Sequence, residues 1–190
     1  MITPMLAQDL PHARPRRLTR DEYHRLAQIG LFRDDERVEL IHGTLVEMAP
    51  IGPPHANVVD VLNELLVIKL SGRAKVRIQQ PLLGADESEP EPDVAVVPVG
   101  SYAERHPDQA YLVIEVAESS LDYDRATKAP LYAGSRVHEY WIVDVTGRAV
   151  IVHREANAGG YAQVTRVGEG ETLEPTLFPD VRITVASLFA

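Results

Sequence analysis

Two short apolar runs, one interrupted by Asp93 and the other by Glu115, constrain the fold of this chain more than any other feature. Asp93 lies in the run 91–97, and Glu115 lies in the run 111–117. Runs of this length, rich in valine and isoleucine, are typical of buried β-strands. Because an unpaired charge in a buried strand costs several kcal/mol, each acid needs a partner. A bound metal cation is the leading candidate.

The alternation of side chains along a strand predicts where these acids point. If both runs are strands, Asp93 shares a face with Ala95, and Glu115 shares a face with Val113. Ionised carboxylates on neighbouring strands repel each other, whereas a divalent cation between them reverses the sign. Oxygen ligands alone suit Mg²⁺ or Mn²⁺. The spacing is equally compatible with each acid pairing with an arginine or accepting backbone hydrogen bonds.

Length and composition point to one domain inside a cell. The chain has 190 residues, enough to bury roughly 70% of its unfolded surface. It has no cysteine, which excludes disulfides and thiolate metal sites and fits a reducing cytoplasm. We find neither a signal-peptide pattern nor a run of about 18 apolar residues. We therefore expect a soluble, cytoplasmic protein without a membrane partner.

The formal net charge of -9 argues against a broad surface for nucleic acids, because non-specific affinity for DNA comes from many Lys and Arg contacts. Two local clusters of basic residues soften this argument, and we interpret both mainly as solvated surface charge. They are Arg14, Arg16, Arg17 and Arg20, and Lys69, Arg73, Lys75 and Arg77.

The hydrophobic pattern predicts an N-terminal arm over residues 1–18, followed by a single domain over residues 19–190. Thr19 and Glu22 form the pattern of a capping box for a helix to about residue 28. A longer helix follows Pro53, and a short one is expected at 129–133. The expected strands cover 37–41, 44–49, 74–83, 91–97, 111–117, 138–145, 149–153, 161–167 and 181–185.

This order of elements predicts an α/β or α+β fold, with a mixed β-sheet flanked by helices and extra β-hairpins. Ligands of such sheets tend to bind where strands end or diverge. The pattern around Asp93 and Glu115 also resembles the PD-(D/E)xK nuclease superfamily. There, an Asp and a Glu on adjacent strands bind Mg²⁺, and a Lys two residues after the Glu positions the attacking water. In this chain the lysine position is Ala117.

More of the chain resembles one branch of that superfamily, the Uma family of proposed restriction endonucleases. The similar segments are 39–45, His55, 79–81, 91–96, 112–118, 123–128, 131–133 and 138–144. The resemblance implies a restriction-endonuclease-like fold and metal-dependent hydrolysis of DNA. It also implies that Lys128 supplies the missing lysine, and that Glu39 joins Asp93 and Glu115 around the metal.

Pro130 restricts the helix that could carry Lys128 to the site. Proline in a helix interior loses a hydrogen bond and clashes with the carbonyl four residues earlier. A continuous helical face from Asp124 through Lys128 to Tyr132 is therefore not expected. Instead, we predict that Thr127 is the N-cap of a helix with Pro130 in its first turn. Lys128 would then lie at the helix start, near the polar segment that follows Glu115, where it either reaches the site or is a surface lysine.

Three further residues are candidates for contacts with substrate. Gln80 ends a predicted strand beside Asp93, where it either binds a metal-bound water or phosphate or is a satisfied edge-strand amide. His55 opens a helix and acts either as a base or phosphate contact or as a packing residue. Tyr132 is expected in the core with a partner for its hydroxyl.

Together these features predict an Mg²⁺- or Mn²⁺-dependent endonuclease that hydrolyses DNA, with Asp93, Glu115 and Lys128 as catalytic residues. One alternative is a non-catalytic interaction module that keeps the fold, and another is a hydrolase of a small phosphorylated molecule. We expect a homodimer, since symmetric dimers dominate soluble assemblies.

Overall fold

A six-stranded mixed sheet forms the centre of the protein. The computed structural model describes residues 16–33, 35–85 and 87–190, so most of the predicted arm lies outside the described residues. The strands follow the spatial order β3, β4, β5, β6, β7, β8, in which β5 and β6 pair in parallel and the other neighbours pair antiparallel. Their bounds are Lys75–Ile78, Val94–Val97, Leu112–Ala117, Tyr140–Asp144, Ala149–Asn157 and Gly160–Gly168.

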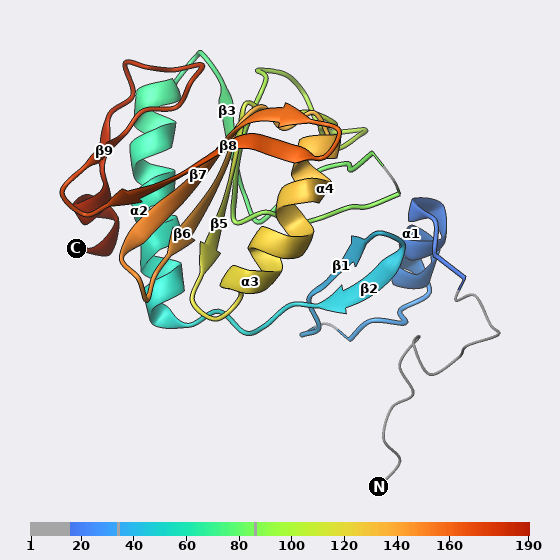
Figure 1. Ribbon diagram of the computed structural model, residues 1–190. Coiled ribbons are helices and arrows are strands. Elements are labelled where there is room, and N and C mark those ends of the chain that lie inside the picture. Colours follow the sequence, from blue (N-terminus) through green and yellow to red (C-terminus); the bar gives the residue numbers. More distant parts are fainter. Residues whose placement is uncertain (1–15, 34, 86) are drawn as a thin grey trace, which may run out of the picture.

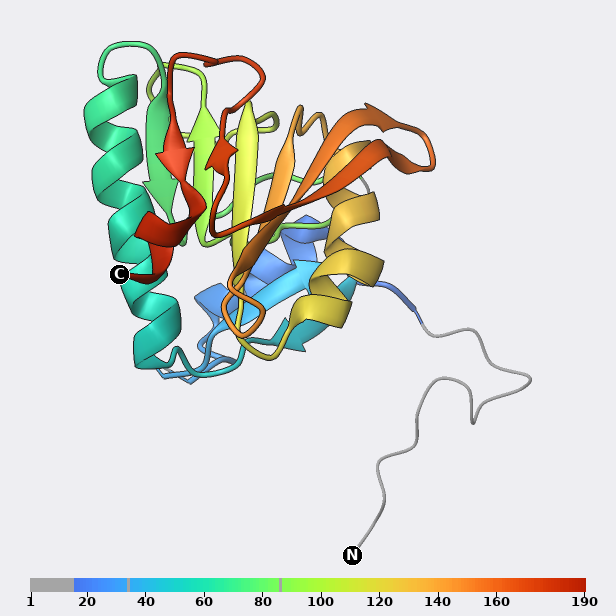
Figure 2. The same ribbon diagram turned by 60° about the vertical axis from the view of Figure 1, so that its left-hand side comes forward.

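Helices cover both faces of this sheet, as Figure 2 shows. On one face, α2 (Pro53–Leu70) packs against β3, β4 and β5 and buries Val58, Leu62 and Leu66 in the core. The other face is covered by a helical segment in three parts: α3 (Leu121–Tyr123), the π-helical turn η2 (Asp124–Lys128) and α4 (Ala129–Gly134). Tyr132 packs there against the opposite side of the sheet. The predicted mixed sheet flanked by helices is confirmed.

The π-helical turn corrects our prediction for the segment around Pro130. Thr127 is not an N-cap, because the helical segment already begins at Leu121. Within η2 the N–H of Ala129 donates to the carbonyl of Asp124, five residues earlier, and this wider turn makes room for a proline that lacks an N–H. As a result Asp124, Lys128 and Tyr132 are all buried.

A separate unit lies beyond one end of the sheet (Figure 1). It consists of α1 (Arg20–Gln28) and the antiparallel hairpin of β1 (Val38–Ile41) and β2 (Thr44–Glu47). The predicted capping box of Thr19 and Glu22 is present. The hairpin turns at His42 and Gly43, whose φ angles of 50° and 74° match a type I′ turn.

The C-terminal part differs in detail from prediction. The hairpin β7–β8 is longer than expected, and a small sheet pairs β9 (Thr172–Leu173) with β10 (Ile183–Thr184), of which β9 was not predicted. The 3-10 helix η3 (Val185–Phe189) lies beside α2 (Figures 1 and 2). No helix in the described part of the chain is long and apolar enough to cross a membrane.

Candidate active site

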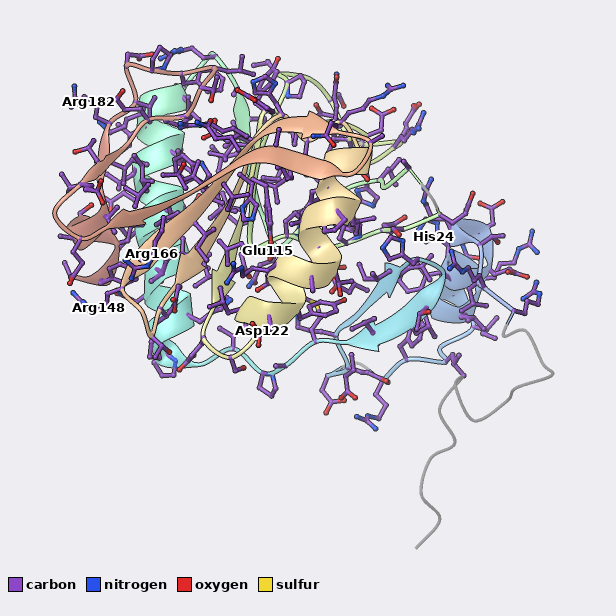
Figure 3. All side chains as sticks on the ribbon, in the orientation of Figure 1. His24, Glu115, Asp122, Arg148, Arg166 and Arg182 are labelled. Carbon is purple, nitrogen blue, oxygen red and sulfur yellow. The ribbon has the colours of Figure 1, made fainter. Side chains whose placement is uncertain are left out.

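The register of β4 and β5 brings the two predicted acids together. Val94 pairs with Ile114 in this antiparallel ladder, so Asp93 and Glu115 are the next residues to face each other. The N–H of Asp93 lies 3.3 Å from Glu115 Oε2, and the N–H of Val116 donates to Asp93 Oδ2 at 2.8 Å. Both acids line one cavity of about 310 Å³. Figure 3 shows Glu115 between the sheet and the α3–α4 segment.

Lys128 projects from η2 into the same site. Its ammonium donates to Glu115 Oε1 at 3.0 Å and lies 3.3 Å from Glu39 Oε1. Tyr132, one turn further along, donates its hydroxyl to the same Glu115 oxygen at 2.7 Å. The structure therefore places the predicted lysine against the predicted acid, although the route through a π-helical turn differs from our expectation.

The hairpin contributes Glu39, which lies on β1 and is 2% exposed. Besides Lys128, its carboxylate lies 3.3 Å from the backbone N–H of Glu91. Asp124 adds a further buried carboxylate, which accepts a hydrogen bond from Ser120 Oγ at 2.6 Å. Among the described residues that line the cavity, six acids face only two Lys or Arg side chains, Arg37 and Lys128. The site thus carries an excess of negative charge.

Burial and hydrogen bonding shift the pKa values of the two central acids in opposite directions. Burial raises the pKa of Glu115 to about 8, with Lys128 opposing the shift and Asp93 adding to it. Burial also acts to raise the pKa of Asp93, but hydrogen bonds from His55 and the Val116 N–H outweigh it, and the pKa falls below its usual value. Burial alone would lower the pKa of Lys128, yet the surrounding carboxylates raise it. Asp93 is therefore ionised at neutral pH, whereas Glu115 keeps its proton to a higher pH than an ordinary glutamate.

Of the three residues predicted to contact substrate, the structure places two, His55 and Tyr132, against the acids of the site. His55 lies beside Asp93, with Nε2 at 3.0 Å from Oδ2, while its buried Nδ1 finds no hydrogen-bond partner among the described residues. Tyr132 binds Glu115, as described above. Gln80 is exposed and lies outside the described lining of the cavity, whereas Gln79 approaches Asp93 Oδ1 at 3.3 Å.

The difference between Gln79 and Gln80 has a local cause. Strand β3 ends at Ile78, well before the predicted end at residue 83, because Gln79 adopts a φ of 48° and Pro81 follows. This turn directs the side chain of Gln79 toward Asp93. Sequence reasoning also missed Tyr123, whose ring lies 5.9 Å from Lys128 Nζ. Its only sequence signal was its place in the segment 123–128.

A further part of the cavity lining comes from β2, the segment that follows it, and the residues just before α3. The apolar residues of this wall are Val46, Met48, Ala49, Pro50 and Ile51. Within the described ranges, no group of three or more His, Cys, Asp or Glu side chains is arranged to hold a metal ion. Of the predicted trio, Glu39 and Glu115 both contact Lys128, and Asp93 contacts His55.

A mixed sheet whose adjacent central strands present an Asp and a Glu to one cavity, next to a buried Lys, defines a restriction-endonuclease-like protein. More specifically, the chain belongs to the Uma2 family, described as "Putative restriction endonuclease", whose model matches residues 20–186.

A solved structure supports the fold. The chain is similar to a "putative nuclease belonging to DUF820" from Anabaena variabilis, with 14% sequence identity and a TM-score of 0.73. The match covers 90% of this chain and 97% of the other. No curated protein matches the chain.

Proposed function

We propose that this protein is an Mg²⁺- or Mn²⁺-dependent endonuclease that hydrolyses phosphodiester bonds in DNA. The observation that carries the proposal is the convergence of Asp93, Glu115 and Lys128 in one cavity, in a chain that belongs to a restriction endonuclease family. Hydrolysis consumes one water: its oxygen bonds to phosphorus, the bond from phosphorus to the leaving deoxyribose oxygen breaks, and that oxygen receives the proton.

The donor chemistry of the site fits a hard divalent cation. Asp93 Oδ1 and Glu115 Oε2 each accept only one long hydrogen bond among the described residues, at 3.3 Å, which leaves an oxygen of each acid available. Mg²⁺ is usually held by one or two carboxylates and keeps several of its waters, so Asp93 and Glu115 suffice as protein ligands. Glu39 would act through a water. When bound, the metal would activate a water and stabilise negative charge on the phosphate.

The protein's own groups supply orientation and charge. Lys128 would neutralise charge that develops on a phosphate oxygen, because its ammonium is fixed in a buried position and needs no reorganisation. His55 fixes the Asp93 carboxylate and Tyr132 fixes the Glu115 carboxylate. Both acids are therefore held in place before substrate arrives.

One alternative rests on a specific observation. Lys128 is already paired with Glu39 and Glu115, so the charges of the site partly satisfy each other, as expected for an interaction module that has lost its chemistry. The other alternative, a hydrolase of a small phosphorylated molecule, keeps the same residues in the same roles and differs only in the substrate.

A plasmid-nicking assay tests the proposal. Wild-type protein should convert supercoiled DNA to nicked or linear forms with Mg²⁺ or Mn²⁺ and not with chelator, and Asp93→Ala should abolish the reaction. Asp122→Ala is the matched control, because Asp122 is an exposed acid outside the described cavity lining (Figure 3). If wild type nicks the plasmid no faster than Asp93→Ala does, the site does not contribute to cleavage, and the interaction module is favoured. Sedimentation of the same protein tests the expected homodimer.

A further inference from the structure

The lining of the active-site cavity has parts that differ in chemistry. One part holds the buried Asp93, Glu115 and Lys128. Another part of the lining comes from β2 and the segment between β2 and α2, where Met48 and Ile51 form an apolar surface next to Glu47. In Figure 1 this segment passes beneath α3 on its way to α2. A ligand in the cavity would therefore meet both charged groups and an apolar surface.

The reactive groups are almost completely buried and line this cavity. Asp93 is 6% exposed, Glu115 is 3% exposed and Lys128 is 5% exposed. A scissile phosphate must enter the cavity to reach them. The volume of about 310 Å³ lies at the lower end of the range of pockets that enclose one small molecule. This space suits a single nucleotide, whereas in duplex DNA each nucleotide is fixed to its complement and stacked between neighbours.

The charge distribution also disfavours a duplex bound along its backbone. Affinity for duplex DNA comes largely from many Lys and Arg contacts with phosphates, but Lys128 and Arg37 of the cavity are already near acids, at 3.0 Å from Glu115 and 4.0 Å from Glu91. Arg148, Arg166 and Arg182 lie toward the margin of the molecule, away from Glu115 (Figure 3). Contacts within the cavity must therefore supply most of the affinity.

We infer that the preferred substrate is an unpaired nucleotide of DNA, either in a single strand or at a bulge in a duplex. Its phosphate would lie at Asp93 and Glu115, and its base would lie against the apolar wall at Met48 and Ile51. In pockets that take up a flipped-out base, the base stacks between aromatic or apolar side chains. Unpaired bases also enter a pocket at the lowest cost, because no pairing has to be broken. This inference rests on the proposed endonuclease function.

Three DNA substrates of one sequence test the inference: a single strand, a perfect duplex, and a duplex with one unpaired nucleotide. In single-turnover reactions with Mn²⁺, the single strand and the bulged duplex should be cut at least about tenfold faster than the perfect duplex, with cuts in the bulged substrate next to the unpaired nucleotide. A perfect duplex that is cut as fast as the single strand would overturn the inference.

A small chromogenic diester, thymidine 5′-p-nitrophenyl phosphate, tests hydrolytic activity separately from the preference for unpaired nucleotides. If it is hydrolysed in an Asp93-dependent reaction while duplex and single strand react equally, hydrolytic chemistry at the site stands and the preference for unpaired nucleotides fails. If neither the diester nor any DNA is hydrolysed, both proposals fail.

A pair of tryptophan substitutions tests the apolar wall itself. Ile51→Trp fills the cavity, whereas Ile68→Trp changes an exposed residue on α2 outside the described cavity lining. With both variants folded, as measured by their unfolding midpoints, Ile51→Trp should cut the single strand at least about tenfold more slowly. Ile68→Trp should stay near the wild-type rate. Equal rates for the two variants would refute a role of this wall in binding the base.

Discussion

Replacing Glu115 by glutamine should change how the stability of the protein depends on pH. Burial raises the pKa of Glu115 in the folded protein from 4.5 to about 8. Between these two values the folded state binds more protons than the unfolded state, so the free energy of unfolding must fall as pH rises. The amide introduced by Glu115→Gln does not titrate, but it keeps an oxygen for the hydrogen bonds from Lys128 and Tyr132. The variant thus mimics the protonated acid.

The size of the effect follows from the shift. A pKa shift of one unit corresponds to about 1.4 kcal/mol, so a rise from 4.5 to about 8 is worth about 5 kcal/mol as an order of magnitude. Near pH 5 Glu115→Gln and wild type should be similarly stable. The advantage of the variant should then grow by about 1.4 kcal/mol per pH unit and level off above about pH 8.

Urea unfolding in the presence of chelator measures this difference. The single tryptophan, Trp141, is fully buried and reports unfolding by fluorescence. Glu118→Gln is the matched control, since Glu118 is an exposed acid at the same cavity, and its stability relative to wild type should not follow this pH course. Comparing variants cancels the titration of histidines elsewhere. If the difference in the free energy of unfolding between Glu115→Gln and wild type stays constant from about pH 5 to about pH 8, the pKa of Glu115 is not raised by its burial.

Two further predictions concern metal and lysine. Mn²⁺ or Mg²⁺ should raise the melting temperature, because a cation that binds only the folded state stabilises it; Asp93→Asn should lose this shift, and an equal shift in both proteins would argue against metal at Asp93. Lys128→Ala should bind metal at least as tightly but cleave DNA about 10²-fold more slowly. Arg125→Ala, an exposed neighbour on η2, should cleave normally, and a fast Lys128→Ala would exclude this lysine from catalysis.

The sequence predicted the placement of Asp93 and Glu115 because strand geometry leaves little freedom. Side chains alternate along a strand, and two apolar runs of this length separated by a turn region pair as neighbours. The capping box of α1 and the turn at His42 and Gly43 were also predictable, since each depends on residues close in sequence. The choice of Gln80 failed because it depended on where β3 ends. A single positive φ at Gln79 decides that point.

The position of the lysine depends on packing that the sequence pattern alone does not show. Ala117 lies two residues after Glu115, as the superfamily pattern requires of a lysine, but it is 1% exposed and packs in the apolar cluster with Tyr132. A lysine there would displace that packing or leave a buried charge without a partner. Instead, the π-helical turn η2 adds a residue to the helical segment and directs Lys128 to within 3.0 Å of Glu115. Pro130, which opposes a continuous α-helix, is compatible with this turn because it has no N–H to donate. Ala117 thus preserves the apolar packing under α4, and the π-helical turn η2 brings a cation, Lys128, to Glu115 from the helical segment instead.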